Sequence, residues 1–255
     1  MGTKVLNCRS KNILVIGDTH LPFIHPDAHI WLKAIKEKYL TIPKRKKKTD
    51  YVVTHIGDEV DFHNLSFHSV EPDLPFSPSS ELEEALDYLH MKDGLHDLFP
   101  TTFVCESNHG SMVYRKQRHM GMPRYVFKSY KEILKTKKWQ WHEDYILRTN
   151  RGDVYLHHGR TKIDRLVQSV HCSAVQGHYH GLHSIQYWRK PNSMYNIFGA
   201  QTGCLIDIVT DSYAFAYNKL SVVRPIMGSL LITSDGRPQL LTMGLDKNNR
   251  WDGKL

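Results

Sequence analysis

The sequence is poor in cysteine and contains no long apolar run. The 255 residues include only four cysteines, and none of them forms a Cys-x-x-Cys pair. This spacing argues against a zinc ribbon and a disulfide framework and favours a reducing compartment. The strongest apolar run, Ile13 to Ile16, is far too short to span a bilayer, and the residues after Met1 lack the apolar stretch of a signal peptide. We therefore expect a cytoplasmic protein without a membrane partner.

The composition is that of an ordinary globular protein. Hydrophobic residues make up 40% and charged residues 24% of the chain, which excludes a disordered, collagen-like or membrane-bundle protein. The length is ample for a sizeable core, and the chain shows no internal repeat, low-complexity segment or long linker. We expect a single domain over residues 1–255.

The charge balance is basic and histidine is abundant. The chain has 34 Lys and Arg residues against 26 Asp and Glu residues, a formal net charge of +8, and 17 histidines. The surplus fits a polyanionic partner or an anionic substrate, and equally a basic protein that binds no nucleic acid. The basic run at Lys44–Lys48 is interpreted as a solvated connector rather than a phosphate-binding patch.

Strands and helices alternate in the first two thirds of the sequence, and strands dominate the last third. Unbroken apolar runs predict buried strands at 12–17, 51–56, 101–105 and 173–176, and helical patterns lie at 28–40, 81–98, 122–139 and 162–170. A hairpin is expected between 145–148 and 154–156. Further strands are expected at 184–189, 194–198, 205–209, 221–225, 228–233 and 239–243. The pattern is that of an α/β protein.

Five of the expected strands end in residues that could bind a metal. The side chains are Asp18 with His20, Asp58, Asn108, His158, and His178 with His180. Each alone is explained by ordinary turn chemistry, but the carboxyl ends of parallel strands gather side chains at one crevice, and five unrelated turns in this order are improbable. His157 is an alternative to His158, which we prefer because it precedes Gly159 and strand alternation lets only one of the two face inward.

In this order the motifs resemble those of the calcineurin-like metallophosphoesterases. The matches are Gly17-Asp18-Thr19-His20, Gly57-Asp58-Glu59-Val60-Asp61, Ser107-Asn108-His109-Gly110, His158-Gly159 and Gly177-His178-Tyr179-His180. The resemblance covers residues 17–180. It implies a two-sheet β-sandwich flanked by helices, with the β-rich portion 181–255 completing the second sheet and a dinuclear metal site at the strand carboxyl ends.

The resemblance also implies roles for individual residues. One ion would be held by Asp18, His20, Asp58 and His180, and the other by Asp58, Asn108, His158 and His178, with Asp58 bridging. Two divalent transition-metal ions are expected, because ligands of Asp, Asn and imidazole without thiolate suit manganese, iron, zinc, nickel or cobalt and not a closed structural zinc site. Of these metals, manganese is preferred. The implied chemistry is hydrolysis of a phosphate ester by a metal-bridging hydroxide, with Asp58 and His109 catalytic.

Two positions depart from the family pattern. Ser107 stands where Gly is usual, and Gly110 stands where Asp or Glu is usual. In the family that carboxylate orients the catalytic histidine, so another group must orient His109 or it is held less firmly. Asp61 and Glu106 are the nearest candidates.

The segments after the motifs predict the substrate class. We interpret Arg115, Lys116 and His63 as phosphate contacts because they follow the third and second motifs closely. Together with the basic charge they favour a nucleotide or nucleic-acid phosphate. With no capping domain visible, a nucleotide phosphomonoesterase is preferred over a DNA or RNA phosphodiesterase. A phosphoprotein phosphatase is disfavoured because Asp61 is followed by Phe62-His63 instead of Arg, and a metal-binding module without turnover is the last alternative, motivated by Gly110.

Overall fold

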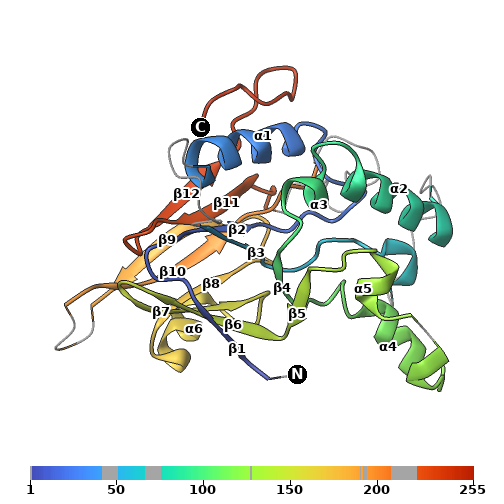
Figure 1. Ribbon diagram of the computed structural model, residues 1–255, viewed down its shortest axis with the longest axis horizontal. Helices are drawn as coiled ribbons and strands as arrows, with labels where there is room; N and C mark the ends of the chain where they lie inside the picture. Colours follow the sequence, from blue (N-terminus) through green and yellow to red (C-terminus); the bar gives the residue numbers. More distant parts are fainter. Residues whose placement is uncertain are drawn as a thin grey trace.

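Two six-stranded sheets form the centre of the protein (Figure 1). The computed structural model describes residues 2–41, 51–66, 76–126, 128–189, 191, 194–207 and 223–255. The first sheet has the order β12 (Pro238–Thr242), β11 (Gly228–Ile232), β2 (Asn12–Ile16), β3 (Tyr51–His55), β4 (Phe103–Cys105) and β5 (Gln140–His142). The second has the order β1 (Lys4–Asn7), β6 (Asp144–Thr149), β7 (Gly152–His157), β8 (Ser173–Gln176), β10 (Ile197–Thr202) and β9 (His183–Trp188).

Helices flank both sheets. The first sheet is accompanied by α1 (Ala28–Ile35), which continues into a π-helical turn at Lys36–Leu40, and by α2 (Pro78–His90) and α3 (Leu95–Leu98). Beyond β4 lie α4 (Met112–His119) and α5 (Tyr130–Ile133). The second sheet is covered by α6 (Ile163–Val170), whose Ile163, Leu166 and Val167 pack against Tyr155 and Ala174. The predicted fold of two sheets flanked by helices is thereby confirmed.

The apolar run of β2 belongs to two separate cores. Ile13 and Val15 pack between the sheets with residues such as Tyr145, whereas Leu14 and Ile16 pack with Trp31 of α1 on the other face. Because alternate side chains of a strand point to opposite faces, a strand covered on both faces needs apolar residues at every position. This burial explains why the run predicts a central strand.

Several element boundaries differ from the sequence-based expectation. The helix predicted over 122–139 is wrong: the described residues of that region hold only a 3-10 turn at Arg124–Val126 and the short α5, and a helix, α4, precedes them. Gly121, with a φ of +67°, and Pro123 interrupt the helical pattern. The expected helix 81–98 is two helices, α2 and α3, separated around Gly94.

The carboxyl-terminal portion does not complete the second sheet alone. β9 and β10 join that sheet, but β11 pairs with β2 and β12 pairs with β11 in the first sheet. This corrects the expectation for residues 181–255, and the reason is that β11 buries apolar residues toward both cores. Of the strand expected at 205–209, Leu205 to Asp207 are described and contribute an isolated bridge at Ile206. Of the strand expected at 221–225, residues 223–225 are described and form no strand, and residues 221–222 and the basic run Lys44–Lys48 lie outside the described residues.

One ion pair fixes the carboxyl-terminal segment on α1. The Arg250 guanidinium donates to the carboxylate of Asp27, with Nε 2.7 Å from Oδ2, and the Trp251 amide donates to the same Oδ2 at 3.0 Å. The bond from Arg250 lowers the pKa of Asp27 from its ordinary value of 3.8 to about 2. The stabilisation is therefore complete above the ordinary pKa and is lost as the pH falls through about 2.

We expect Arg250→Met to lower the midpoint of thermal unfolding at pH 7 by about 2–4 °C, because the buried Asp27 carboxylate loses its cation. Arg250 itself is mostly exposed, which limits the effect. The difference from wild type should shrink below the ordinary pKa of 3.8, where Asp27 protonates in the unfolded chain, and be lost below about pH 2, where it protonates in the folded chain. Thermal melts from pH 2 to pH 7 measure this, and a difference that is constant over the range would contradict the assignment.

Candidate metal centre

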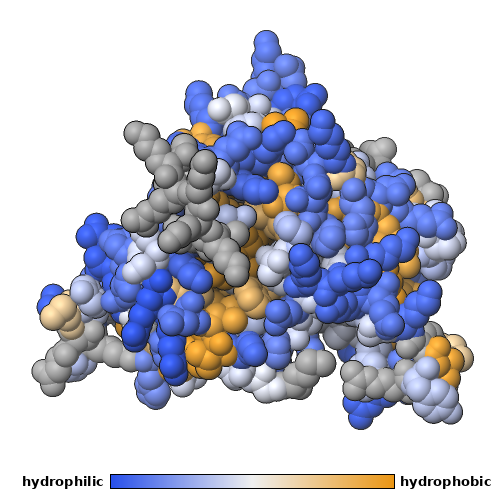
Figure 2. Space-filling view, viewed as in Figure 1, coloured by the Kyte–Doolittle hydropathy of each residue, from blue (hydrophilic) through white to orange (hydrophobic). Residues whose placement is uncertain are grey.

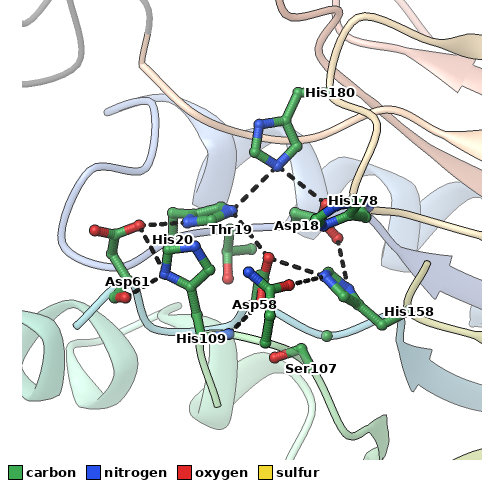
Figure 3. A network of polar contacts seen from close by, with 12 residues as sticks. Asp18, Thr19, His20, Asp58, Asp61, Ser107, His109, His158, His178 and His180 are labelled. Atoms are coloured by element: carbon green, nitrogen blue, oxygen red, sulfur yellow. Dashed lines mark hydrogen bonds and ion pairs between the residues drawn. The ribbon is translucent and has the colours of Figure 1, made fainter. Parts of the chain in front are cut away.

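The predicted ligands meet at one edge of the two sheets. Asp18 and His20 follow β2, Asp58 follows β3, Asn108 follows β4, His158 follows β7, and His178 and His180 follow β8. β2, β3 and β4 are parallel to one another, and β7 is parallel to β8, so their carboxyl ends point the same way within each sheet. Figure 3 shows the side chains pointing toward one another from loops of both sheets.

The first group contains Asp18, His20, Asp58 and His180, whose candidate ligand atoms all lie within 4.8 Å of one another. His180 Nε2 is 3.2 Å from both Asp18 Oδ2 and His20 Nε2. His20 Nε2 is 3.5 Å from Asp58 Oδ2. Asp18, His20 and Asp58 are each at most 1% exposed, so their charges are withdrawn from water.

The second group contains Asp58, His158 and His178, again with ligand atoms within 4.8 Å. His158 Nε2 is 3.0 Å from Asp58 Oδ2 and 2.8 Å from Asn108 Oδ1. Asp58 is thus the residue common to both groups. His157 does not enter the cluster: its ring stacks on Tyr155 at 6.2 Å between centroids, and its Nδ1 accepts from the Gly159 amide.

The hydrogen bonds of His158 test whether a cation fits between the side chains of the second group. His158 Nδ1 lies 3.2 Å from the Ile56 carbonyl oxygen, which can only accept, so Nδ1 carries the proton. Nε2 of the neutral ring is then an acceptor, yet it faces the oxygens of Asp58 and Asn108. Three acceptors converging on one point require a positive charge between them. A proton on Nε2 could supply this charge, and a divalent metal fits the same donors.

The charges of the cluster agree with this. Burial alone would lower the pKa of His158, but the carboxylates of Asp58 and Asp18 raise it to about 9. Burial alone would raise the pKa of Asp58, but the charge of His158 outweighs burial and holds it well below its ordinary value. In addition, Asp18 Oδ1 is buried without a hydrogen-bond partner among the described residues. Buried carboxylates and imidazoles without thiolate suit divalent cations such as Mn²⁺.

Asp61 orients two histidines from behind. Its Oδ1 is 2.6 Å from His20 Nδ1 and 3.3 Å from His109 Nδ1, and its backbone carbonyl oxygen accepts a hydrogen bond from the same His109 nitrogen. Asp61 therefore supplies the group that orients His109, in place of the carboxylate that the motif lacks at Gly110. Glu106, the other candidate, is exposed.

Left-handed backbone conformations aim several of these side chains. His20, Asp58 and His178 have φ angles of 45°, 50° and 64°, a region that costs free energy in residues with a Cβ and is concentrated at functional sites. Gly57, with a φ of 118°, precedes Asp58, and a Cβ there would lie 2.7 Å from His158 Nδ1. Only glycine satisfies both requirements at this turn.

The three expected phosphate contacts lie at different places around the cluster. His63 Nδ1 is 3.7 Å from Asp61 Oδ2, and its side chain is 30% exposed, at the edge of the cluster. Arg115 Nη2 donates to the backbone oxygen of Asn108 at 2.6 Å, so this guanidinium supports the ligand loop. Lys116 is the next residue of α4 and is half-buried.

Sequence reasoning missed the buried residues beneath the ligands. Thr19 Oγ1 is 3.2 Å from His55 Nε2, and His55 Nδ1 accepts from the Gly57 amide at 3.2 Å. Glu59 is 1% exposed and accepts a 2.7 Å hydrogen bond from the Trp141 indole. Glu59 and Thr19 occupy variable positions inside the motifs, so the motif pattern itself gave no signal for them.

We expect Asp61→Asn to weaken Mn²⁺ binding about ten- to a hundredfold, the usual scale for removing a group that orients a metal-bound histidine. The amide is nearly isosteric, but its nitrogen cannot accept from His20 or His109. Titration calorimetry with Mn²⁺ measures the change, with Asp164→Asn, half-buried in the first turn of α6 and outside the cluster, as the control. Unchanged affinity would show that Asp61 does not position these rings.

None of the helices in the described part of the chain combines the length and the apolar character that a membrane span requires.

Comparisons with known proteins find similarity in structure only. No family model matches the chain, and no curated protein matches its sequence. The solved structure of Vps29 from Chaetomium thermophilum is 12% identical over 95% of this chain and 90% of that one, with a TM-score of 0.44. An archaeal phosphodiesterase is 10% identical over 91% and 99%, with a TM-score of 0.45. A serine/threonine phosphatase from Saccharomyces cerevisiae is 11% identical over 96% and 85%, with a TM-score of 0.42.

Proposed function

We propose that this protein is a metal-dependent phosphoesterase that hydrolyses a phosphate ester of a nucleotide or nucleic acid. The observation that carries the proposal is Asp58, whose buried carboxylate belongs at once to the group with Asp18 and His20 and to the group with His158 and His178. A carboxylate shared between two sets of imidazole and carboxylate donors is the arrangement that a dinuclear site needs.

The residues that would hold the ions are those predicted from the motifs. Asp18, His20, Asp58 and His180 would bind one ion, and Asp58, Asn108, His158 and His178 the other. When bound, two divalent ions polarise the phosphoryl oxygen and neutralise the charge that develops in an in-line displacement. We favour manganese because all the donors are oxygen or imidazole nitrogen.

His109 is assigned to the proton transfer. Its Nδ1 donates to the Asp61 carbonyl oxygen, so the proton that the ring can give away sits on Nε2. The His109 amide also donates to Asp58 Oδ1 at 3.2 Å, which ties the backbone of His109 to the shared carboxylate. A histidine fixed in this way can protonate a leaving alkoxide or stabilise its developing charge.

The contact between Asp61 and His109 argues against the alternative of a metal-binding module without turnover. That alternative was motivated by the missing carboxylate at Gly110, and Asp61 supplies an orienting group from another loop. We therefore favour an enzyme. His63, at the edge of the cluster beside Asp61, remains the proposed substrate contact nearest to the metal centre.

A parallel assay with Mn²⁺ tests the function. Phosphate release from a panel of nucleoside monophosphates is measured beside cleavage of end-labelled single- and double-stranded DNA. We expect hydrolysis of at least one class and none by Asp58→Asn. Release from monophosphates alone would identify a nucleotide phosphomonoesterase, and strand cleavage alone a phosphodiesterase. No hydrolysis of any substrate, or equal hydrolysis by the variant, would contradict the proposal.

A further inference from the structure

The positive charge of the chain is concentrated in one segment beside the metal centre. Residues 112–138, here called the basic arm, contain nine Lys and Arg residues and a single acidic residue, Glu132. The rest of the chain has 25 basic and 25 acidic residues, so the arm accounts for the whole formal net charge of +8. The arm includes α4, which directly follows the third motif, and α5. In Figure 1 both helices lie together at the periphery of the molecule.

The surface of the arm combines this charge with exposed apolar and aromatic side chains. Tyr125 is 88% exposed, Met120 64% and Val126 58%, and Tyr114 of α4 is also exposed. Figure 2 shows apolar atoms at this outer end of the molecule, next to hydrophilic ones. Cationic side chains interleaved with aromatic ones are typical of surfaces that bind single-stranded nucleic acid.

A cavity of about 770 Å³ separates the arm from the first sheet. This volume is in the range of sites for small ligands. Tyr114 and Tyr130 line it from the arm and Trp141 from β5, while Lys128 and Lys131 contribute exposed cationic side chains. The cavity therefore has an aromatic lining, with two lysines and Glu132 on the side of the arm and Glu59 and Glu106 on the side of the sheet.

The aromatic rings in the cavity are held in place. The Trp141 indole donates to the buried Glu59 carboxylate at 2.7 Å. Tyr130 meets Trp141 edge to face, with 5.5 Å between ring centroids and an interplanar angle of 78°. Rings that are already fixed lose little conformational entropy when a flat ligand stacks on them.

The cavity also adjoins the metal centre. Ser107 and Gly110, which flank the ligand Asn108 and the proposed acid His109, belong to its wall. At Gly110 the motif lacks its usual carboxylate, and a Cβ built there would be 3.7 Å from the Tyr130 ring. A side chain at this position would stand between Ser107 and Tyr130, so glycine leaves this part of the wall open and adds no charge to that of Glu106, which also lines the cavity.

We propose that the basic arm and this cavity bind a single-stranded nucleic acid, with one base in the aromatic cavity and the phosphate backbone along Lys128 and Lys131. The strand then passes Gly110 toward the metal centre. Only the cleavage of the bound strand rests on the proposed function, and the binding of the strand does not. A base must leave its helix to enter such a cavity, so the site favours single strands over duplexes.

Binding is measured by fluorescence anisotropy in EDTA, where no hydrolysis interferes. The probes are a labelled 12-nucleotide oligothymidylate, an abasic strand of the same length, a duplex, and vesicles containing phosphatidylserine. We expect the oligothymidylate to bind several-fold more tightly than the abasic strand or the duplex, because only its bases are free to stack. Equal binding of the abasic strand, or binding to vesicles without binding to the oligonucleotide, would overturn the proposal.

Matched variants separate a defined site from general positive charge. Lys128→Gln with Lys131→Gln removes two charges at the cavity, and Lys4→Gln with Lys247→Gln removes two from exposed positions elsewhere. The slope of log affinity against log salt concentration should fall by about 1.4 in the first pair only. Tyr114→Ala should weaken binding roughly five- to a hundredfold, and Tyr114→Trp should restore it. Equal effects of the two lysine pairs would overturn the proposal.

Hydrolysis assays keep this inference distinct from the proposed function. If the wild type cleaves both the oligonucleotide and a small nitrophenyl ester, the Lys128 and Lys131 pair should slow only the oligonucleotide. Equal slowing of both substrates would contradict a strand-binding role. Strand binding with the expected variant pattern but no hydrolysis of any ester would support the binding site and overturn the proposed function.

Discussion

Replacing Asp58 by Asn is expected to lower turnover by more than about 10²-fold, the usual scale for losing a group that stabilises charge in a transition state. The Asp58 carboxylate is 1% exposed and lies 3.0 Å from His158 Nε2 and 3.5 Å from His20 Nε2. Of the three candidate metal-binding groups in the described part of the chain, two share Asp58, and no other acidic residue belongs to more than one. An amide has the same shape but no charge, so both ions would lose a shared anionic ligand.

Steady-state hydrolysis of the best substrate of the nucleotide and DNA panel measures the Asp58→Asn effect. Asp153→Asn, on the exposed start of β7, is the matched control because it also removes one negative charge. Circular dichroism and thermal melts show whether both variants are folded. Activity within tenfold of wild type in a folded Asp58→Asn protein would contradict the shared role of this carboxylate.

Replacing His109 by Ala has the second-largest expected effect. Loss of a proton donor typically costs about 10²–10⁴-fold. The cost should depend on the substrate, because a nitrophenolate leaves without protonation whereas a ribose or deoxyribose oxygen does not. We expect Ala at position 109 to slow nucleotide or DNA hydrolysis by at least about 10²-fold and the nitrophenyl ester much less.

The comparison of two leaving groups makes the His109 prediction specific. A structural role of the ring would slow both substrates alike, since it would disturb the cluster before any leaving group matters. His29→Ala, on α1, serves as the control for removing an imidazole outside the cluster. Equal slowing of the two substrates by His109→Ala would argue against an acid role.

The sequence predicted which side chains would meet at one edge of the sheets, because these side chains follow strands that can be predicted from the sequence. β2 is apolar from Ile13 to Ile16 because it faces two cores, and its end at Ile16 places Asp18 and His20 just beyond the strand. β3 before Asp58 is partly buried and β8 before His178 is buried throughout, and each ends shortly before these residues. Parallel pairing then brings their carboxyl ends together.

The parts that the sequence could not predict depend on contacts between distant segments. β1 and β5 are sheet edges whose existence depends on pairing with β6 and β4, and their own patterns are weak. Asp61 was one of two candidates for orienting His109, and only the fold shows that its carbonyl and carboxylate both reach that ring. Arg115 stays a predicted phosphate contact, and only the fold shows that it also donates to the backbone of Asn108.

Metal stoichiometry tests the central claim most directly. The purified protein is dialysed against Mn²⁺, and the bound metal is counted by mass spectrometry in wild type and in Asp58→Asn. The arrangement of Asp18, His20 and His180 on one side of Asp58 and of His158, His178 and Asn108 on the other predicts two ions per chain in wild type and fewer in the variant. Binding of no metal by the wild type, or of the same number of ions by both proteins, would contradict a dinuclear site built on Asp58.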